Sequence, residues 1–182
     1  MQEFAAGRAC AHRLLAEFGI VDFPVKAARD RQPQWPETLV GSITHTAGFC
    51  AAVLALKKDL SSVGIDSEIR ASVKPELWRS ICTVSETAWL HSLPDAEQTL
   101  AATLIFSAKE AFYKCQYPLV AERLNFHDVS VQIGDWGRPE GEFKIRAHRQ
   151  VALEQHAPAP WPGRYLFHDE FMTTGIALPA RR

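Results

Sequence analysis

Three carboxylates on two expected elements could form a site for a divalent cation. Asp66 and Glu68 lie two residues apart in a stretch expected to be a strand, so both side chains leave the same face. Glu110 lies in a long helical pattern, with Lys109 beside it and Lys114 one helical turn further on. Mg²⁺ takes a few carboxylates together with substrate phosphates and water. Spacing alone more simply indicates a solvated strand edge and an ordinary Glu–Lys pair on a helix.

A second candidate site is the segment GSITH at residues 41–45. A strand that ends in small hydroxyl residues and a histidine can present backbone amides, hydroxyls and an imidazole to a phosphate group. Thr44 and His45 would supply the hydroxyl and the imidazole. Taken alone, the pattern more simply indicates a core strand whose histidine caps a turn.

The elements that must position these residues can be predicted from apolar periodicity. Apolar residues three and four apart predict a helix over 4–18, with Gly19 as its glycine cap. A short strand is expected over 40–45, and an apolar buried element over 48–56. The N-terminal part of the chain is therefore expected to combine one helix with a small amount of sheet.

The polar residues 57–62 mark the expected boundary between an N-terminal half, residues 1–60, and a C-terminal half, residues 61–182. The longest helical pattern covers 95–116, and Pro118 is expected to end it. The other expected elements are a strand over 63–68, short helices over 75–81 and 85–93, and antiparallel strands between about 127 and 178, including the stretch RYLFHDEF.

Composition limits the class of protein. The chain has 182 residues and a formal net charge of −1, with 47% apolar and 23% charged residues. This balance is typical of a folded globular protein and excludes global disorder. The near-zero charge argues against nucleic acid as the main partner. The length allows one domain, or two small halves that share one core.

The cysteines and the apolar stretches indicate the compartment. Cys10, Cys50, Cys82 and Cys115 lack zinc-site spacing, and we expect reduced core thiols rather than a disulfide framework. No stretch has the roughly 20 mainly apolar residues of a transmembrane segment. Charged residues interrupt the N-terminal apolar residues, so no signal peptide is predicted and a cytoplasmic protein is expected.

Taken together, these segments resemble the 4′-phosphopantetheinyl transferase superfamily, in particular its surfactin-type and enterobactin synthase component D-like members. VGIDSE (63–68) resembles one signature of the family, and FSAKEAFYK (106–114) resembles a second, whose glutamate lies 42 residues after Glu68. GSITH resembles a third signature. FAAGRACAHRLL (4–15) and RQPQWP (31–36) resemble upstream elements of the family. The resemblance follows the chain in order over most of its length.

The resemblance implies an α/β (α+β) fold, a pseudodimer of two similar halves with the active site in the cleft between them. By motif position, Asp66, Glu68 and Glu110 would hold Mg²⁺, or Mn²⁺, against the diphosphate of coenzyme A. Lys114 would contact the same phosphates. The further residues implied to bind coenzyme A are Arg8, Arg31, Thr44, His45 and Lys109. Glu86 resembles an acidic position near the metal, and either Glu86 or a metal-bound water could accept the proton of the attacking serine.

The implied reaction transfers the 4′-phosphopantetheine arm of coenzyme A to a serine of an apo carrier protein (a peptidyl, aryl or acyl carrier domain) and releases 3′,5′-ADP. Enterobactin-like siderophore synthesis, or other non-ribosomal peptide synthesis, is the expected context, and an enterobactin-synthase-like assembly is a candidate setting. A monomer is expected, with an N-terminal half that lacks the family's usual first segment. The alternatives are a coenzyme A- or nucleotide-binding module without transfer activity, and an Mg²⁺-dependent phosphodiesterase.

Overall fold

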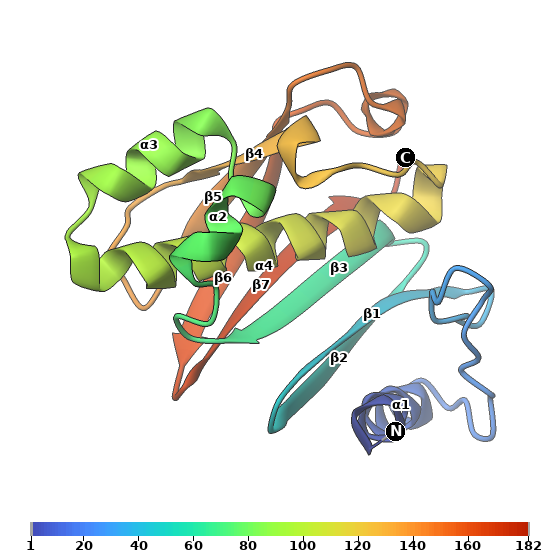
Figure 1. Ribbon diagram of the computed structural model, residues 1–182. Coiled ribbons are helices and arrows are strands. Elements are labelled where there is room, and N and C mark those ends of the chain that lie inside the picture. The colour runs from blue at the N-terminus through green and yellow to red at the C-terminus, as the bar shows by residue number, and fades with distance from the viewer. Residues whose placement is uncertain (1, 182) are drawn as a thin grey trace.

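Residues 2–181 form a mixed α/β fold in the computed structural model, which describes side chains from residue 5 to residue 181 (Figure 1). The helices are α1 (Gln2–Glu17), α2 (Pro75–Ile81), α3 (Val84–Ser92) and α4 (Asp95–Val120), with short 3₁₀ turns η1 (Phe126–Asp128) and η2 (Ala152–Gln155). The strands are β1 (Leu39–Thr46), β2 (Phe49–Leu56), β3 (Leu60–Ile69), β4 (Val129–Ile133), β5 (Glu140–Ala147), β6 (Trp161–His168) and β7 (Phe171–Pro179). The predicted α/β class is confirmed.

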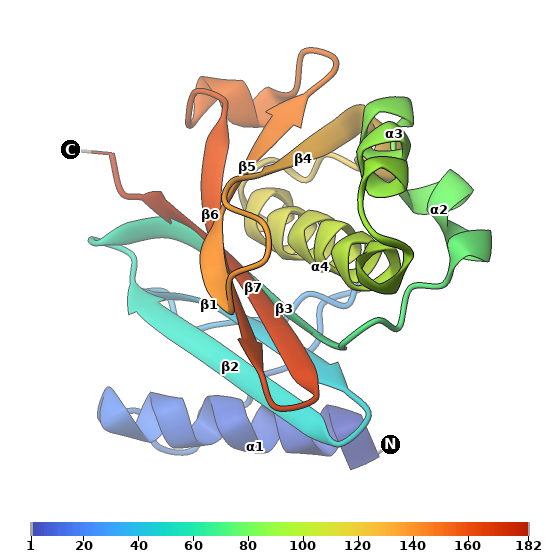
Figure 2. The same ribbon diagram turned by 90° about the vertical axis from the view of Figure 1, so that its left-hand side faces the viewer.

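The N-terminal part consists of a hairpin and a helix. Strands β1 and β2 pair antiparallel through a two-residue connection, and Gly48 in that connection has φ +83°, a conformation that glycine adopts without a side-chain clash. Helix α1 lies along β2 (Figure 2). Ala11 and Leu15 on α1 pack with Val25 and Leu39 in a small apolar cluster. This cluster holds the helix against the hairpin.

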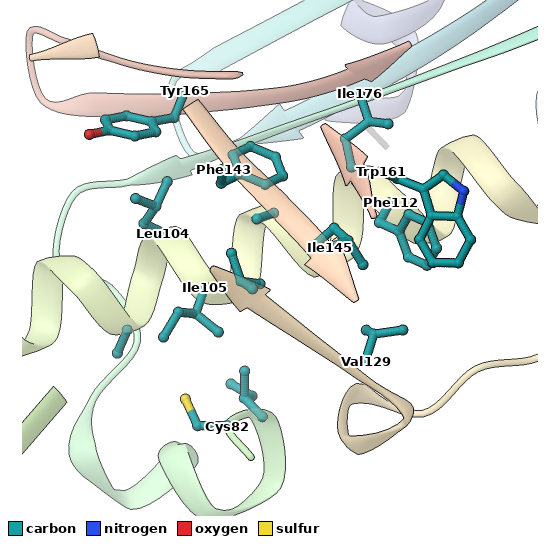
Figure 3. Packing of buried hydrophobic residues seen from close by; sticks show 14 of the residues in the cluster. Cys82, Leu104, Ile105, Phe112, Val129, Phe143, Ile145, Trp161, Tyr165 and Ile176 are labelled. Atoms are coloured by element: carbon teal, nitrogen blue, oxygen red, sulfur yellow. The ribbon is translucent and has the colours of Figure 1, made fainter. Parts of the chain in front are cut away.

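The C-terminal part is a five-stranded antiparallel sheet with the order β3-β7-β6-β5-β4, and α4 crosses one of its faces (Figures 1 and 2). Phe112 of α4 packs against Trp161 of β6, with ring centroids 5.0 Å apart. Leu104 of α4 points toward Phe143 in the same core, and Ile105, the next residue, points toward Cys82 (Figure 3). These contacts anchor α4 along its length. The side chains on the face of α4 that points away from the core are therefore held in fixed positions relative to the sheet.

Side chains of β1 fasten the hairpin to β3. The backbone N–H of Ile65 donates to Ser42 Oγ at 3.1 Å, and that of Ser67 donates to Thr44 Oγ1 at 2.8 Å. Both hydroxyls are buried. These bonds satisfy two strand amides that would otherwise be buried without an acceptor. They fix the hairpin beside the strand that carries Asp66.

Two predicted boundaries are wrong. Helix α4 continues through Pro118 to Val120 and ends at Ala121, whose φ of 50° is left-handed. A proline in the last turn removes only one helical hydrogen bond, so the helix tolerates it there. The stretch expected as one strand around RYLFHDEF is a hairpin, because Asp169 has φ 47° and turns the chain between β6 and β7.

No helix among residues 2–181 has the length and apolar character needed to cross a membrane. The turn after β2 separates the hairpin from β3, and the division into halves 1–60 and 61–182 stays a prediction.

Candidate active site

A cavity of about 880 Å³ lies between the hairpin side of the molecule and α4. Its wall combines the irregular segment 30–35, strand β1 and one face of α4. Four of the residues expected to bind or react line it: Arg31, His45, Glu110 and Lys114. The structure thus brings together residues that lie up to 83 positions apart in the sequence.

Asp66 is the most deeply buried acid beside this cavity, with an exposed fraction of 4%. The Lys114 ammonium donates to Asp66 Oδ1 at 2.6 Å, and the Thr44 hydroxyl lies 3.4 Å from the same oxygen. The second oxygen, Oδ2, is buried and has no hydrogen-bond partner among the described protein atoms. Burial raises the pKa of Asp66, and the nearby Lys114 charge partly opposes the shift. The carboxylate therefore retains an acceptor that the protein leaves unused.

Glu68 and Glu110 belong to the same electrostatic cluster. Burial raises the pKa of Glu68 to about 7, and repulsion from Asp66 and Glu110 adds to the shift while Lys114 opposes it. Burial also raises the pKa of Glu110, and Asp66 contributes in the same direction. The three acids predicted to converge, Asp66 and Glu68 on β3 and Glu110 on α4, therefore lie close enough to shift one another's pKa. Lys114 is the one positive charge that opposes these shifts.

Gly64 brings α4 close enough to β3 for this cluster to form. A methyl group at Gly64 would overlap the carbonyl oxygen of Ala111 and lie 2.6 Å from the backbone nitrogen of Cys115. Helix backbone therefore rests directly on strand backbone at this point. Since Gly64 lies two residues before Asp66, and Ala111 follows Glu110, the contact fixes the height of the helix acid above the strand acid.

The donor set suits a hard divalent cation. Among the described side chains, residues 5–181, no group of three His, Cys, Asp or Glu residues is arranged to hold a metal ion, and the Lys114 ammonium contacts Asp66. A bound cation would nevertheless be a partner for the unused Asp66 Oδ2. It would also reduce the repulsion among the three carboxylates. Asp66, Glu68 and Glu110 fit Mg²⁺ in chemistry and in number.

Two residues implied to contact phosphates do not line the cavity. Thr44 is buried, with its hydroxyl accepting from Ser67 N–H and directed to Asp66, and it does not appear in the cavity wall. Its side chain joins β1 to β3 rather than facing a ligand. Arg8 lies on α1, also outside the cavity wall, where burial lowers the pKa of its guanidinium. His45 and Arg31 are exposed and do line the cavity.

Glu86 and Lys109 form a buried pair apart from the cavity wall. Lys109 Nζ donates to Glu86 Oε2 at 2.7 Å and to the carbonyl oxygens of Ile81 and Phe126, which uses all three of its protons. Burial lowers the pKa of Lys109, and the Glu86 charge opposes the shift. Their side chains are 3% and 1% exposed, respectively. A phosphate ligand or a proton acceptor needs access to substrate, so the geometry disagrees with both roles.

Glu86 instead organises backbone groups. Its Oε2 accepts from the N–H of Thr83, the N-cap of α3, in a capping box, and its Oε1 accepts from the N–H of Val131 on β4 at 2.7 Å. The carboxylate therefore ties α3, α4 and β4 together.

Several cavity residues had no predicted role in binding coenzyme A or in the reaction. Tyr113 and Tyr117 stack with ring centroids 5.2 Å apart and line the wall beside Lys114. Their four-residue spacing on the helix that carries Glu110 is a signal that a helical projection would reveal. Lys57 and Trp35 also line the wall, but their approach depends on how loops fold, which local sequence does not show.

Comparisons with known proteins bear on both parts of the chain. Residues 62–167 match the 4′-phosphopantetheinyl transferase superfamily, and residues 1–55 match the 4′-phosphopantetheinyl transferase N-terminal domain. The chain is 31% identical to 4′-phosphopantetheinyl transferase Npt of Nocardia iowensis, over 97% of this chain and 81% of that protein.

Two further relatives are matched over a smaller share of their length. Identity is 34% to 4′-phosphopantetheinyl transferase Svp of Streptomyces mobaraensis, over 73% of this chain and 54% of that protein. It is 40% to enterobactin synthase component D of Salmonella typhi, over 62% of this chain and 46% of that protein. The matched region thus spans about half the length of these two relatives.

Proposed function

Because the chain belongs to the 4′-phosphopantetheinyl transferase superfamily, we propose that it transfers the 4′-phosphopantetheine arm of coenzyme A to a serine of an apo carrier protein, with release of 3′,5′-ADP. The observation that carries the proposal is the meeting of Asp66, Glu68 and Glu110 with Lys114 at a cavity of about 880 Å³. A cavity of this size can take a nucleotide-sized ligand.

Asp66, Glu68 and Glu110 are the residues that would hold Mg²⁺ or Mn²⁺. A bound cation would neutralise charge on the diphosphate, a contribution worth several kcal/mol in phosphate chemistry. The unused oxygen of Asp66 supports this assignment, because a buried acceptor without a partner is costly.

The Lys114 ammonium supplies a positive charge even when no metal ion is bound. In the cation-free state it neutralises Asp66. Its side chain is 30% exposed and lines the cavity, so its ammonium can turn from Asp66 to a phosphate oxygen. His45 and Arg31 line the same cavity and are proposed to hold the phosphates of the nucleotide end. Positioning and charge neutralisation carry most of the rate in reactions of this class.

The proton of the attacking serine needs an acceptor within reach of the cavity. Glu86 is enclosed by Lys109, Thr83 N–H and Val131 N–H, so we do not assign the role to it. Glu110 lines the cavity, but it is also one of the three carboxylates proposed to hold the cation, and a bound cation would oppose the upward shift of its pKa that burial causes. We therefore assign the role to no side chain, and a water held by the cation would be the acceptor.

The biological setting is also proposed. The relative from Salmonella typhi is named enterobactin synthase component D, which supports a carrier domain of siderophore or other non-ribosomal peptide synthesis as the partner. A cytoplasmic monomer, with residues 1–60 and 61–182 forming the two walls of the cleft, agrees with this role.

Mass spectrometry of a carrier protein tests the proposal. The chain is incubated with coenzyme A, Mg²⁺ and apo carrier domains of peptidyl, aryl and acyl type. A carrier that gains one phosphopantetheine group on its serine supports transfer. Coenzyme A binding without a modified carrier would instead indicate a binding module, and cleavage of coenzyme A without a modified carrier would indicate a phosphodiesterase.

A further inference from the structure

Two cysteines from different elements meet at the outer side of the hairpin. Cys10 lies on α1 and Cys50 near the start of β2, and their sulfur atoms are 3.1 Å apart. Both side chains are partly exposed. A disulfide needs a sulfur–sulfur distance of about 2.05 Å, so an approach of roughly 1 Å suffices to bond them.

The other two cysteines provide an internal comparison. Cys82 and Cys115 are buried in the core of the C-terminal part. Burial raises the pKa of each of these two thiols to about 12, which keeps them protonated and shielded from small reagents. Only Cys10 and Cys50 combine access with a partner at bonding range among the described residues.

We propose that Cys10 and Cys50 form a reversible disulfide that fastens α1 to the β1–β2 hairpin. The oxidant is a small-molecule disulfide, such as oxidised glutathione. A thiolate of the pair attacks one sulfur of that disulfide, forms a mixed disulfide and releases one small thiol. The second cysteine then displaces the remaining small thiol. The protein loses two protons and two electrons, and the small disulfide gains both.

The bridge would close beside one residue of the candidate site, His45. In the β1–β2 ladder, Cys50 is the direct partner of His45, which lines the cavity. A bond here would hold the helix and the His45 strand in one arrangement. The disulfide does not depend on transfer activity, so the experiments below test it independently of the proposed function.

Thiol mapping of the full chain tests the proposal. The purified chain is equilibrated with reduced and oxidised glutathione in several ratios at mildly alkaline pH, because burial raises the pKa of Cys50 to about 11 and its thiolate is scarce near neutrality. Free thiols are then alkylated and the peptides identified by mass spectrometry. We expect a peptide pair joined through Cys10 and Cys50, reversed by reductant, with Cys82 and Cys115 alkylated only after unfolding.

Thermal melting supplies an independent readout. The bridge closes a loop of about 40 residues, so the oxidised chain should melt about 5–10 °C above the reduced chain. Cys10→Ala and Cys50→Ala should each abolish this shift, whereas Ala9→Ser, a change at an exposed neighbour, should retain it. The proposal is overturned if Cys10 and Cys50 remain thiols or carry only separate glutathione adducts, or if Cys10→Ala keeps the oxidative shift.

Discussion

Lys114 Nζ lies 2.6 Å from Asp66 Oδ1, and this contact joins helix α4 to strand β3. The same lysine follows Glu110 by one helical turn, so the charge of one ammonium group acts on an acid of β3 and on an acid of α4. Without a metal, the pair prevents an isolated buried charge, which would be costly. With substrate present, the proposed function requires Lys114 to change partner from carboxylate to phosphate.

The contact at Gly64 predicts a severe effect of Gly64→Ala. The added methyl group would meet helix backbone, which cannot rotate away, so we expect a loss of more than about 2 kcal/mol in unfolding free energy. Gly175→Ala is the matched control, because Gly175 pairs with Ile65 in the same sheet and its added methyl would find its nearest neighbour at 3.6 Å. Chemical denaturation of both variants measures the difference. Equal stability would mean that the helix does not rest on Gly64.

The buried Glu86–Lys109 pair predicts a stability effect and little catalytic effect. Glu86→Gln leaves the Lys109 charge without its partner, and we expect a loss of about 3–5 kcal/mol. Glu86→Gln combined with Lys109→Met should recover part of that loss, because it removes both charges. Thermal melting measures stability, and carrier modification per folded molecule measures activity. A folded Glu86→Gln variant that is inactive would restore Glu86 as the proton acceptor.

His45 is proposed to bind the nucleotide end, away from the attacked phosphorus. His45→Ala should therefore raise KM for coenzyme A about tenfold and leave kcat nearly unchanged, since loss of uniform binding acts on KM alone. His156→Ala, at an exposed position outside the cavity wall, is the control. A lower kcat with unchanged KM would place His45 at the reacting centre.

Removal of divalent cations should abolish transfer. Asp66, Glu68 and Glu110 repel one another, and Lys114 alone cannot neutralise both them and a diphosphate. We expect no detectable carrier modification in excess EDTA and recovery on addition of Mg²⁺ or Mn²⁺. Undiminished transfer in EDTA would contradict the metal assignment.

The sequence predicts those features of the site that depend on the geometry of a single strand or a single helix. Alternation along a strand puts Asp66 and Glu68 on one face, and one helical turn separates Glu110 from Lys114. The role of Glu86 near the metal stays a prediction, but the sequence also carries a second signal, because Thr83 and Glu86 have the spacing of a capping box. That pattern predicts a structural carboxylate.

Other features depend on contacts between distant segments. Thr44 was expected to bind phosphate. In the structure its hydroxyl accepts a hydrogen bond from the backbone N–H of Ser67 on β3, an arrangement that depends on how β1 packs beside β3. Cys10 and Cys50 were expected as core thiols and instead meet, partly exposed, where α1 packs on β2. No local pattern specifies either contact, because the partners come from separate elements.

The central claim, a shared cation site formed by β3 and α4, is tested most directly by Asp66→Asn, Glu110→Gln and the double variant. Carrier modification is measured at saturating coenzyme A and Mg²⁺, with Glu76→Gln on the exposed side of α2 as control. Each single change should reduce the rate by about 100-fold or more, because each removes a ligand of the cation. The double variant should lose little more than either single variant, since the two residues act as one unit. Losses that multiply in the double variant, or single variants that stay folded and keep near-normal rates, would contradict the shared site.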